Sequence, residues 1–254
     1  MITTYLQGGL GNYMFQIAAA HSLSLELGTT TLFSETNSTT VHRPLSTYKN
    51  NIFRKINFTY NDVEHPTVHQ EVGFGYGHIP RVNDMMLSGY FQTEKYFTNN
   101  CEEVRELFGP TTEQINYIGN KYGDLSNTCS IHVRRGDYIT QPGNHPPCSP
   151  QYYQEAMVKM PEGTKFLIFS DDIPFCKEVF TGESFIFVEN EVDYIDMYIM
   201  SLCTNNIIAN STFSWWGAWL NKNGNKVVIV PSVWFGVDKQ LDTKDIIPSE
   251  WVKI

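Results

Sequence analysis

Short apolar runs rich in β-branched and aromatic residues alternate along the chain with longer segments whose apolar residues recur at helical spacing. At the start, residues 2–6 (ITTYL) predict a strand, and residues 14–27 (MFQIAAAHSLSLEL) predict a helix. The glycine-rich turn at 7–12 (QGGLGN) joins them, Gly28 suits the end of the helix, and residues 29–34 (TTTLFS) predict a second strand. This order of strand, glycine turn, helix and strand is typical of a doubly wound α/β domain.

The alternation becomes regular in the second half of the chain. Strands are predicted at 129–133, 165–170, 184–189, 205–210 and 226–231. Helices are predicted at 171–180, 192–203 and 211–221. Because strands and helices alternate, we expect a largely parallel sheet.

The region between these two parts is less regular. Residues 36–100 show weak periodicity and predict no element, and residues 101–120 predict a partial helix. The passage at 120–128 (NKYGDLSNT) is rich in Gly, Asn and Ser, as connecting segments are. We therefore predict two α/β halves, residues 1–124 and residues 125–254.

Three polar clusters follow predicted strands of the second half. They are HVRRGDY (132–138), FSDD (169–172) and NSTFSWW (210–216). Ligands of open parallel sheets bind at the carboxyl ends of the strands. The clusters are far apart in sequence, yet this rule brings them to one rim of the sheet and predicts a ligand site there.

Arg134 and Arg135 are the first candidates for chemistry at this rim. A guanidinium is a planar fork that matches phosphate oxygens, so two of them can hold a diphosphate and stabilise it as it leaves, without a metal. Charge-assisted bonds of this kind contribute roughly 1.5–3 kcal/mol each. The alternative is a structural ion pair of either arginine with Asp137.

Ser170, Asp171 and Asp172 end the next strand. A carboxylate there can accept hydrogen bonds from ribose hydroxyls or a base N–H, and paired aspartates can also chelate a metal. Asp172 stands before Ile-Pro-Phe, which predicts that it caps a helix. Asp171 stays open to a ligand.

Ser211, Thr212 and Ser214 lie at the start of the helix that follows the third cluster. Their hydroxyls and the first N–H groups of the helix suit a phosphate. Of the three tryptophans within 215–219, at least two are expected to pack in the core.

The motif GGLGN (8–12) resembles a phosphate loop weakly, because it is not G-x-G-x-x-G and lacks the lysine of a P-loop. Gly9 and Gly11 allow a tight turn, and Asn12 can orient a ligand across a cleft. His132 lies inside a predicted strand, where a core histidine is the simpler interpretation. The seven histidines show no zinc-binding spacing.

Composition narrows the class of ligand and compartment. The net charge of −9 and a pI of about 5.2 exclude a general basic surface for nucleic acid, so an anion must bind in a local pocket. The five cysteines are widely spaced and form no CxxC, which favours a reducing, cytoplasmic environment over a disulfide or metal framework. No Lys or Arg precedes Arg43 and no apolar run approaches a membrane span, so we expect no signal peptide and at most peripheral membrane association.

Taken together, GGLGNYMFQIAAAHSLS, HVRRGDY, FSDD and STFSWWGAWL, in this order up to residue 220, resemble the α1,2-fucosyltransferases of glycosyltransferase family eleven, of the soluble microbial or viral kind. The resemblance implies a GT-B arrangement, two Rossmann-like halves facing across a cleft. It implies GDP-β-L-fucose as donor, a galactose-containing oligosaccharide as acceptor, inversion at the anomeric carbon, and no metal or other cofactor. Residues 1–124 would then be the acceptor side and residues 125–254 the donor side.

The resemblance also suggests roles for particular residues. The H-x-R-R-x-D-Y element lies at His132–Tyr138, and its arginines are taken to bind the donor diphosphate. The glycine element maps to Gly8–Asn12, near the fucose, and S-x-F-S-W-W maps to Ser211–Trp216, which places Phe213 beside the nucleotide. Tyr13 stands where the family has Gln, which puts any role of that Gln side chain in doubt.

In the implied reaction, O2 of a galactose attacks C1 of fucose opposite GDP while Arg134 and Arg135 stabilise the departing β-phosphate. Asp137 is the candidate base, although two positive neighbours favour its ionised form and weaken it as a base, and it can instead orient Arg135. The alternatives are a transferase for another GDP-hexose or linkage, and an inactive glycan-binding relative. The pair of arginines together with Asn12 argues against an inactive relative.

Overall fold

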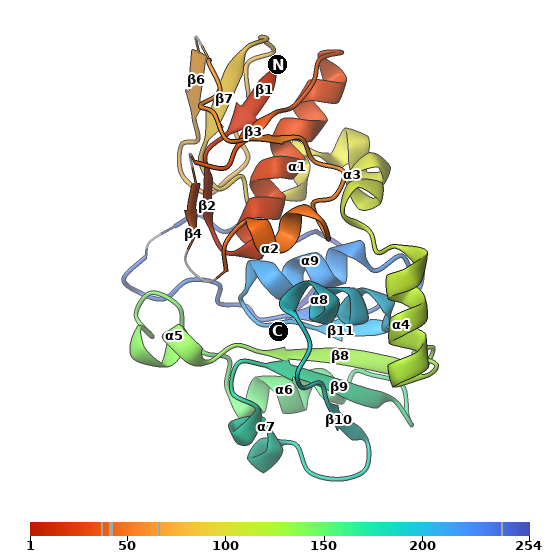
Figure 1. Ribbon diagram of the computed structural model, residues 1–254. Helices are drawn as coiled ribbons and strands as arrows, with labels where there is room; N and C mark the ends of the chain where they lie inside the picture. Colours follow the sequence, from red (N-terminus) through yellow and green to blue (C-terminus); the bar gives the residue numbers. More distant parts are fainter. Residues whose placement is uncertain (37, 41–42, 66, 240) are drawn as a thin grey trace. The chain divides into compact units, whose positions relative to one another are not determined.

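The computed structural model describes residues 1–36, 38–40, 43–65, 67–239 and 241–254. The chain forms two compact units (Figure 1). The first comprises Met1–Gly109 and Leu241–Pro248, and the second comprises Pro110–Gln240 and Ser249–Ile254.

The boundary between the units therefore falls at 109/110 and not within 120–128 as predicted. Helix α4 (Thr112–Tyr122) belongs to the second unit, where its Tyr117 and Lys121 bind the carboxylate of Glu191. A Gly/Asn/Ser-rich passage follows this helix, but it is a connection inside the unit.

The first unit contains short parallel strands around one long helix. Its strands are β1 Ile2–Thr4, β2 Leu6–Gly8, β3 Phe33–Ser34, β4 Ser38–Thr40, β5 Phe58–Thr59, β6 Thr67–Gln70 and β7 Met85–Ser88. Its helices are α1 Leu10–Glu26, α2 Ser46–Lys49, the 3-10 turns η1 Glu94–Tyr96 and η2 Thr98–Asn100, and α3 Cys101–Phe108. The strands form a sheet in the order β1-β7-β6 and two pairs, β2-β4 and β3-β5, all parallel.

The predicted opening of the chain is present with shifted bounds. The strand expected at 2–6 is divided at Tyr5 into β1 and β2, and the strand expected at 29–34 is reduced to β3. The helix starts at Leu10, inside the glycine motif, so that Gly9 is its N-cap residue. The glycine motif is therefore the first turn of α1 as well as a loop.

The second unit is a regular parallel α/β fold. Its strands are β8 Thr128–Val133, β9 Lys165–Ser170, β10 Phe185–Phe187, β11 Asn205–Ile207, β12 Val228–Val230 and β13 Val252–Lys253. Besides α4, its helices are α5 Gly136–Thr140, α6 Pro150–Met157, α7 Ile173–Val179, α8 Asp193–Leu202 and α9 Thr212–Leu220. The sheet order is β10-β9-β8-β11-β12-β13, and every pair is parallel. Helices α6 and α7 cover one face, and α8 and α9 cover the other (Figure 1).

Side chains of the buried strand β8 alternate between these two helical layers. Cys129, Ile131 and Val133 belong to the apolar core that includes α6 and α7. On the other face, Ser130 accepts a hydrogen bond from Asn206, whose amide also donates to the backbone of α8. This alternation determines to which face of the sheet the side chains of the residues after the strand point.

Within the part of the chain that the structure describes, none of the helices combines the length and the apolar character that a membrane crossing requires.

The packing of α8 against α9 yields a prediction at Gly217. An added Cβ would lie 2.9 Å from Cβ of Met200, which is buried, so Gly217→Ala overfills this interface. Overpacking costs about 1–3 kcal/mol, more than the roughly 1 kcal/mol that alanine gains in a helix. We expect a lower free energy of unfolding in urea by about 1 kcal/mol.

The matched control is Gly119→Ala in α4, where an added Cβ meets nothing within 4 Å. Only the helix propensity changes there, so this variant should be more stable by up to about 1 kcal/mol. A shift of the same sign in both variants would contradict the packing argument.

Candidate functional site

The order of strands in the second unit marks a candidate ligand site. From β8 the chain adds β9 and β10 on one side and then β11, β12 and β13 on the other. The strand order therefore reverses between β8 and β11, and ligands of open α/β sheets bind at such a switch point, outside the carboxyl ends of the strands. The candidate site lies where β8 and β11 end.

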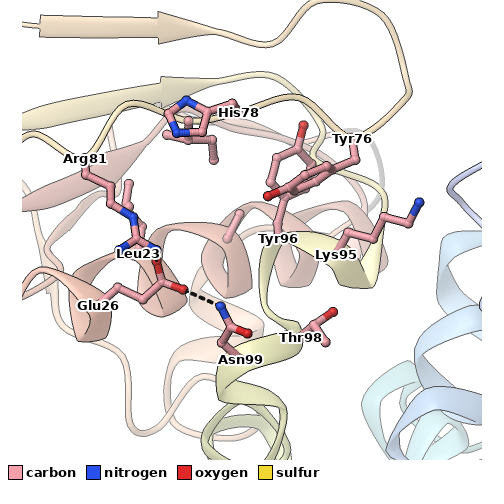
Figure 2. Close-up of a pocket in the computed structure, with 11 residues that line it drawn as sticks. Leu23, Glu26, Tyr76, His78, Arg81, Lys95, Tyr96, Thr98 and Asn99 are labelled. Carbon is pink, nitrogen blue, oxygen red and sulfur yellow. Dashed lines mark hydrogen bonds and ion pairs between the residues drawn. The ribbon is translucent and has the colours of Figure 1, made fainter.

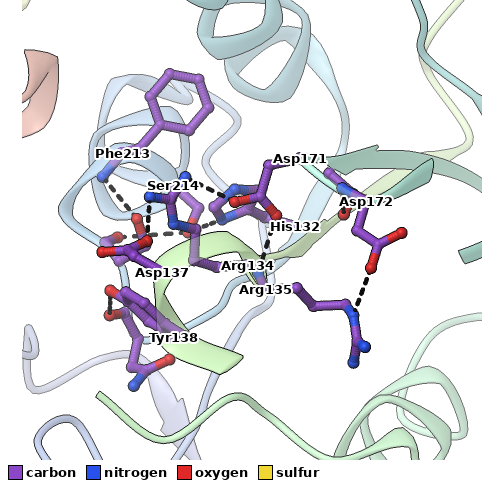
Figure 3. Close-up of polar contacts among 12 residues, drawn as sticks. His132, Arg134, Arg135, Asp137, Tyr138, Asp171, Asp172, Phe213 and Ser214 are labelled. Atoms are coloured by element: carbon purple, nitrogen blue, oxygen red, sulfur yellow. Dashed lines mark hydrogen bonds and ion pairs between the residues drawn. The ribbon is translucent and has the colours of Figure 1, made fainter. Parts of the chain in front are cut away.

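Arg134 and Arg135 follow β8 but point in different directions (Figure 3). The side chains of β8 point alternately to the two faces of the sheet, and this alternation continues into the two arginines. Arg134 points to the same side as His132, and Arg135 points to the same side as Val133. The guanidinium of Arg135 stacks 3.5 Å from the centre of the Phe175 ring in α7. The two arginines therefore do not form one two-pronged clamp in this structure, and Arg134 is the one on the side of α9.

Arg134 lies between two carboxylates. Its Nη2 donates to Oδ1 of Asp137 at 2.6 Å, and its Nη1 lies 2.9 Å from Oδ2 of Asp171. Its guanidinium carbon is 5.5 Å from the ring centre of Tyr138. A guanidinium carries five N–H donors, so these partners leave several available to a ligand.

Arg135 is fixed through its backbone and its Nε. Its N–H donates to Oδ1 of Asp171, and its Nε donates to Oδ2 of Asp172, each at 2.9 Å. Asp172 also caps α7 by accepting from the N–H of Phe175, as predicted. The pKa of Asp172 is lowered, first by the Arg135 hydrogen bond and then by that of Phe175.

Asp171 thus holds the side chain of one arginine and the backbone of the next. The turn has room for the Asp171 side chain in this position because residue 136 is glycine. A Cβ at residue 136 would lie 2.6 Å from Oδ2 of Asp171. Asp137 pairs with Arg134, as the alternative of an ion pair with either arginine predicted, and does not orient Arg135. Ser170 accepts the N–H of Asp172 at 2.9 Å, so it shapes this turn as well.

His132 is a buried histidine with defined partners. Its Nδ1 lies 2.8 Å from Oγ of Ser214 in α9, its ring centre is 5.5 Å from that of Phe213, and its carbonyl accepts from the hydroxyl of Tyr153. Burial, and secondarily the charge of Arg134, lower the pKa of His132 to about 3. The imidazole is therefore neutral and connects β8 to the first turn of α9.

The start of α9 brings the third cluster to the same place. Ser211 is the N-cap, with Oγ accepting from the N–H of Phe213 at 3.4 Å, and Thr212 opens the first turn. The positive end of the helix therefore lies at the carboxyl end of β11. The tryptophans of α9 are buried in the core, as expected.

Two residues outside the predicted set support this site. Tyr138 donates from its hydroxyl to the carbonyl of Asn210 at 2.9 Å, and Asn210 donates to the carbonyls of Pro146 and Trp234. Burial raises the pKa of Tyr138, so the phenol remains a hydrogen-bond donor. The position of both residues at strand ends is the sequence signal that points to them.

The glycine motif lies in the first unit and is braced by residues from another loop. Asn12 accepts from the amide of Gln92 at 3.0 Å, and Gln7 donates to the carbonyl of Gly89 at 3.4 Å. Gly8 has a φ of +90° and leaves no space for a Cβ beside Asn12. Gly9 and Gly11 complete this turn, so all three motif residues of the predicted site stand at the carboxyl end of β2.

A separate hollow of about 130 Å³ lies along α1 in the first unit (Figure 2). Several of its charged groups are already paired: Glu26 binds Arg81 and Asn99, and Lys95 binds Asp245. Its walls contain none of the strand-end residues. We therefore place the chemistry at the strand ends and not in this hollow.

Comparison with known proteins gives the family. Residues 1–254 match Glycosyl transferase family 11. The chain is 36% identical to an alpha-1,2-colitosyltransferase of Escherichia coli over 65% of this chain and 61% of that protein, so this match spans less than two thirds of the relative. It is 30% identical to the O-antigen biosynthesis glycosyltransferase WbnK of Escherichia coli, over 98% and 99% of the two chains. A galactoside 2-alpha-L-fucosyltransferase of Caenorhabditis elegans is 27% identical over all of this chain and 76% of its own.

The fold is also similar to a solved structure. NodZ alpha-1,6-fucosyltransferase, in crystals soaked with GDP-fucose, has a TM-score of 0.56 and 12% identity over 86% of this chain and 92% of its own. At this identity the likeness concerns the fold alone. It confirms the expected GT-B class, an α/β fold with parallel sheets.

The low pKa of His132 predicts a pH dependence of stability. Since its pKa falls from 6.5 to about 3 on folding, only the unfolded chain takes up the proton between these values, and the folded state loses stability as pH falls below 6.5. The loss approaches about 1.4 kcal/mol per pH unit for one proton. Urea unfolding of His132→Asn and of the parent across this range should show a shallower slope in the variant. Equal slopes would mean that His132 takes up its proton in the folded state.

Proposed function

The chain belongs to glycosyltransferase family 11, and on this premise we propose that it transfers L-fucose from GDP-β-L-fucose to a galactoside. The expected linkage is α1,2, formed with inversion at the anomeric carbon. A glycosyltransferase is what the family establishes. The name of the Caenorhabditis elegans relative supports both fucose as the sugar and a galactoside as the acceptor.

The observation that carries the proposal is the cation at the switch point. Arg134 stands at the end of β8 beside the N-terminus of α9, so a guanidinium and a positive helix end lie close together at the switch point. In a chain of net charge −9, this is a local site built for an anion. We infer that the diphosphate of a nucleoside diphosphate sugar binds there.

The reaction then requires two contributions from the protein, stabilisation of the departing phosphate and a base for the hydroxyl proton. As the acceptor oxygen bonds to C1 of fucose, the bond from C1 to the phosphate oxygen breaks, and its electron pair stays on the β-phosphate of GDP. Arg134 and the first turn of α9 stabilise that charge, which is the type of interaction that usually contributes most to catalysis. The hydroxyl proton must pass to a base.

We assign Arg135 a supporting role in this reaction. Its Nε and N–H are used by Asp172 and Asp171, and its guanidinium lies against Phe175 on the α7 side. It therefore fixes the turn that presents Arg134. We expect replacement of either arginine to lower transfer. Arg134 acts through its guanidinium on the phosphate, and Arg135 acts through the turn that it fixes.

The first prediction from this assignment is that Arg134→Ala lowers kcat about 10²–10³-fold, because one strong stabilising group for the leaving phosphate is lost. Arg135→Ala should have a smaller effect on kcat and a larger effect on stability. Steady-state transfer assays measure kcat, GDP titration calorimetry measures the affinity for GDP, and urea unfolding measures stability. Arg81→Ala, which removes an exposed arginine paired with Glu26, is the control.

A folded Arg134→Ala protein that keeps near-normal transfer and GDP affinity would exclude Arg134 as the diphosphate ligand. The same result in the double variant with Arg135→Ala would exclude the whole cluster.

The second prediction concerns metals. Asp171 and Asp172 already pair with the two arginines, and each uses both carboxylate oxygens. We therefore propose that transfer needs no divalent ion and expect full activity in EDTA. Inhibition by EDTA that Mg²⁺ or Mn²⁺ reverses would instead assign these aspartates to a metal site.

Colitose is the alternative donor sugar, since the Escherichia coli relative of 36% identity is an alpha-1,2-colitosyltransferase. Colitose lacks a hydroxyl that fucose carries. A site that hydrogen-bonds that hydroxyl discriminates strongly against the sugar without it. Competition between GDP-fucose and GDP-colitose on a panel of galactosides, with the product linkage read by NMR, decides the donor.

A further inference from the structure

The arginine cluster at the switch point has no excess of positive charge of its own. Arg134 pairs with Asp137 and Asp171, and Arg135 pairs with Asp172. Three carboxylates therefore stand against two guanidinium groups, whereas the leaving group of the proposed reaction is itself an anion. A further cation whose charge no carboxylate offsets would favour the binding of that anion.

Two loops of the second unit meet beside this cluster. One follows α5 and comprises residues 141–149, and the other follows β12 and comprises residues 231–239. The side chain of Asn210, which follows β11, donates to the carbonyls of Pro146 in the first loop and Trp234 in the second. Both loops therefore lie at the carboxyl ends of the strands, where a ligand of this sheet binds.

The two loops are also joined to each other through their backbones. The N–H of Gly236 donates to the carbonyl of Asn144 at 2.9 Å, and the N–H of Asp238 donates to the carbonyl of Gly143 at 2.8 Å. A Cβ at residue 236 would lie 2.3 Å from the carbonyl oxygen of Gly143, so glycine is needed for this approach. These contacts hold the end of the second loop, which carries Lys239, against the first loop.

Lys239 is a half-buried cation that neutral groups hold in place. Its Nζ donates to Nε2 of His145 at 3.0 Å and lies 5.4 Å from the ring centre of Phe235. Within the part of the chain that the structure describes, no carboxylate forms an ion pair with Lys239, whereas Lys121 pairs with Glu191. A carboxylate would position an ammonium and offset its charge, but an imidazole and an aromatic ring position it and leave the charge available to an anion.

His145 connects Lys239 to the arginine cluster. Its ring stacks on that of Tyr138, with 4.9 Å between the ring centres and an angle of 17° between the planes. The guanidinium carbon of Arg134 lies 5.5 Å from the centre of the same Tyr138 ring. Burial and then the charge of Lys239 lower the pKa of His145; Asp137 raises it, and Arg134 lowers it further. The imidazole is therefore neutral at pH 7, and the charges of both cations act on it.

We propose that Lys239 is a second cationic ligand of the donor diphosphate, in addition to Arg134. An ammonium has three N–H donors and Lys239 uses one of them on His145, so two remain for phosphate oxygens. Its charge raises the affinity for the diphosphate of the donor and of the product GDP. The inference rests on the proposed function, because it needs a nucleoside diphosphate sugar, but it does not depend on which sugar or acceptor is used.

Lys239→Met tests this assignment, because it removes the charge and keeps an unbranched side chain. We expect the affinity for GDP, measured by titration calorimetry, to fall about 10–100-fold, since charge-assisted hydrogen bonds are lost. The affinity for guanosine, which has no phosphate, should stay that of the parent in ligand-observed NMR. Lys239→Arg keeps the cation and should keep most of the affinity for GDP.

The matched control is Lys222→Met. Lys222 is an exposed lysine that follows the C-terminal end of α9, whereas the switch point lies at the N-terminal end of this helix. The variant loses the same charge from the same unit. It should bind GDP as the parent does, which separates a local contact from the change in net charge.

The rival role for Lys239 is a structural link between the two loops through His145. Lys239→Gln keeps a hydrogen-bond donor for His145 without the charge, so it separates the two roles and replaces Lys239→Met if that variant does not fold. A diphosphate ligand predicts weaker GDP binding in Lys239→Gln as well. A structural link predicts a lower free energy of unfolding in urea for Lys239→Met, with parent affinity for GDP in Lys239→Gln.

These outcomes are distinct from those that test the proposed function. If the parent transfers no sugar from any GDP-sugar tested, the proposed function fails. If the parent transfers sugar and the folded Lys239 variants bind GDP as the parent does, Lys239 is not a ligand of the diphosphate and the proposed function stands. An equal loss of affinity for guanosine and GDP would also exclude the assignment, because it would show that the nucleoside part of the site has changed.

Discussion

One carboxylate organises the strand-end cluster of the second unit. Asp171 receives the backbone N–H of Arg135 at Oδ1 and pairs with the Arg134 side chain at Oδ2. Each of the two successive cations has a further counter-charge, Asp137 for Arg134 and Asp172 for Arg135. Because Asp171 follows β9 while the arginines follow β8, the neighbouring strands must be in register for the cluster to form. Gly136 is the steric condition for the same contact.

The alternation of side chains along β8 explains why the adjacent residues Arg134 and Arg135 contact different elements. Successive residues of a strand point to opposite faces, and the residues after β8 keep that alternation. Arg134 therefore joins His132 on the side of α9, while Arg135 lies on Phe175 of α7. The sequence contains this information, since the buried strand and its alternation can be predicted from its apolar pattern. A diphosphate clamp of both guanidinium groups is less consistent with that alternation than a site around one of them.

The second unit was more predictable than the first for a physical reason. Its strands β8 and β9 have six residues each, long enough for the apolar pattern to show, and the three polar clusters at strand ends do meet as the parallel topology requires. In the first unit the strands have two to four residues, too few for a period-2 pattern, and their partners are distant in sequence. The return of Leu241–Pro248 to the first unit depends on tertiary contacts such as Asp245 with Lys95 and with the N–H of Tyr76. No local pattern encodes such a contact, and the domain boundary was misplaced accordingly.

Ligands bind at the carboxyl ends of parallel strands, and in the two units of this chain these strand ends differ in charge. The strand ends of the second unit offer Arg134 and a helix N-terminus, which suit a diphosphate. In the first unit, the segments Glu71–Gly73 and Gly89–Gln92, which follow β6 and β7, contain no Lys or Arg and one half-buried carboxylate. These strand ends therefore carry no cation that would attract a phosphate. Charge thus distinguishes the strand ends of the two units: those of the second carry a cation and a helix N-terminus, and those of the first carry a carboxylate.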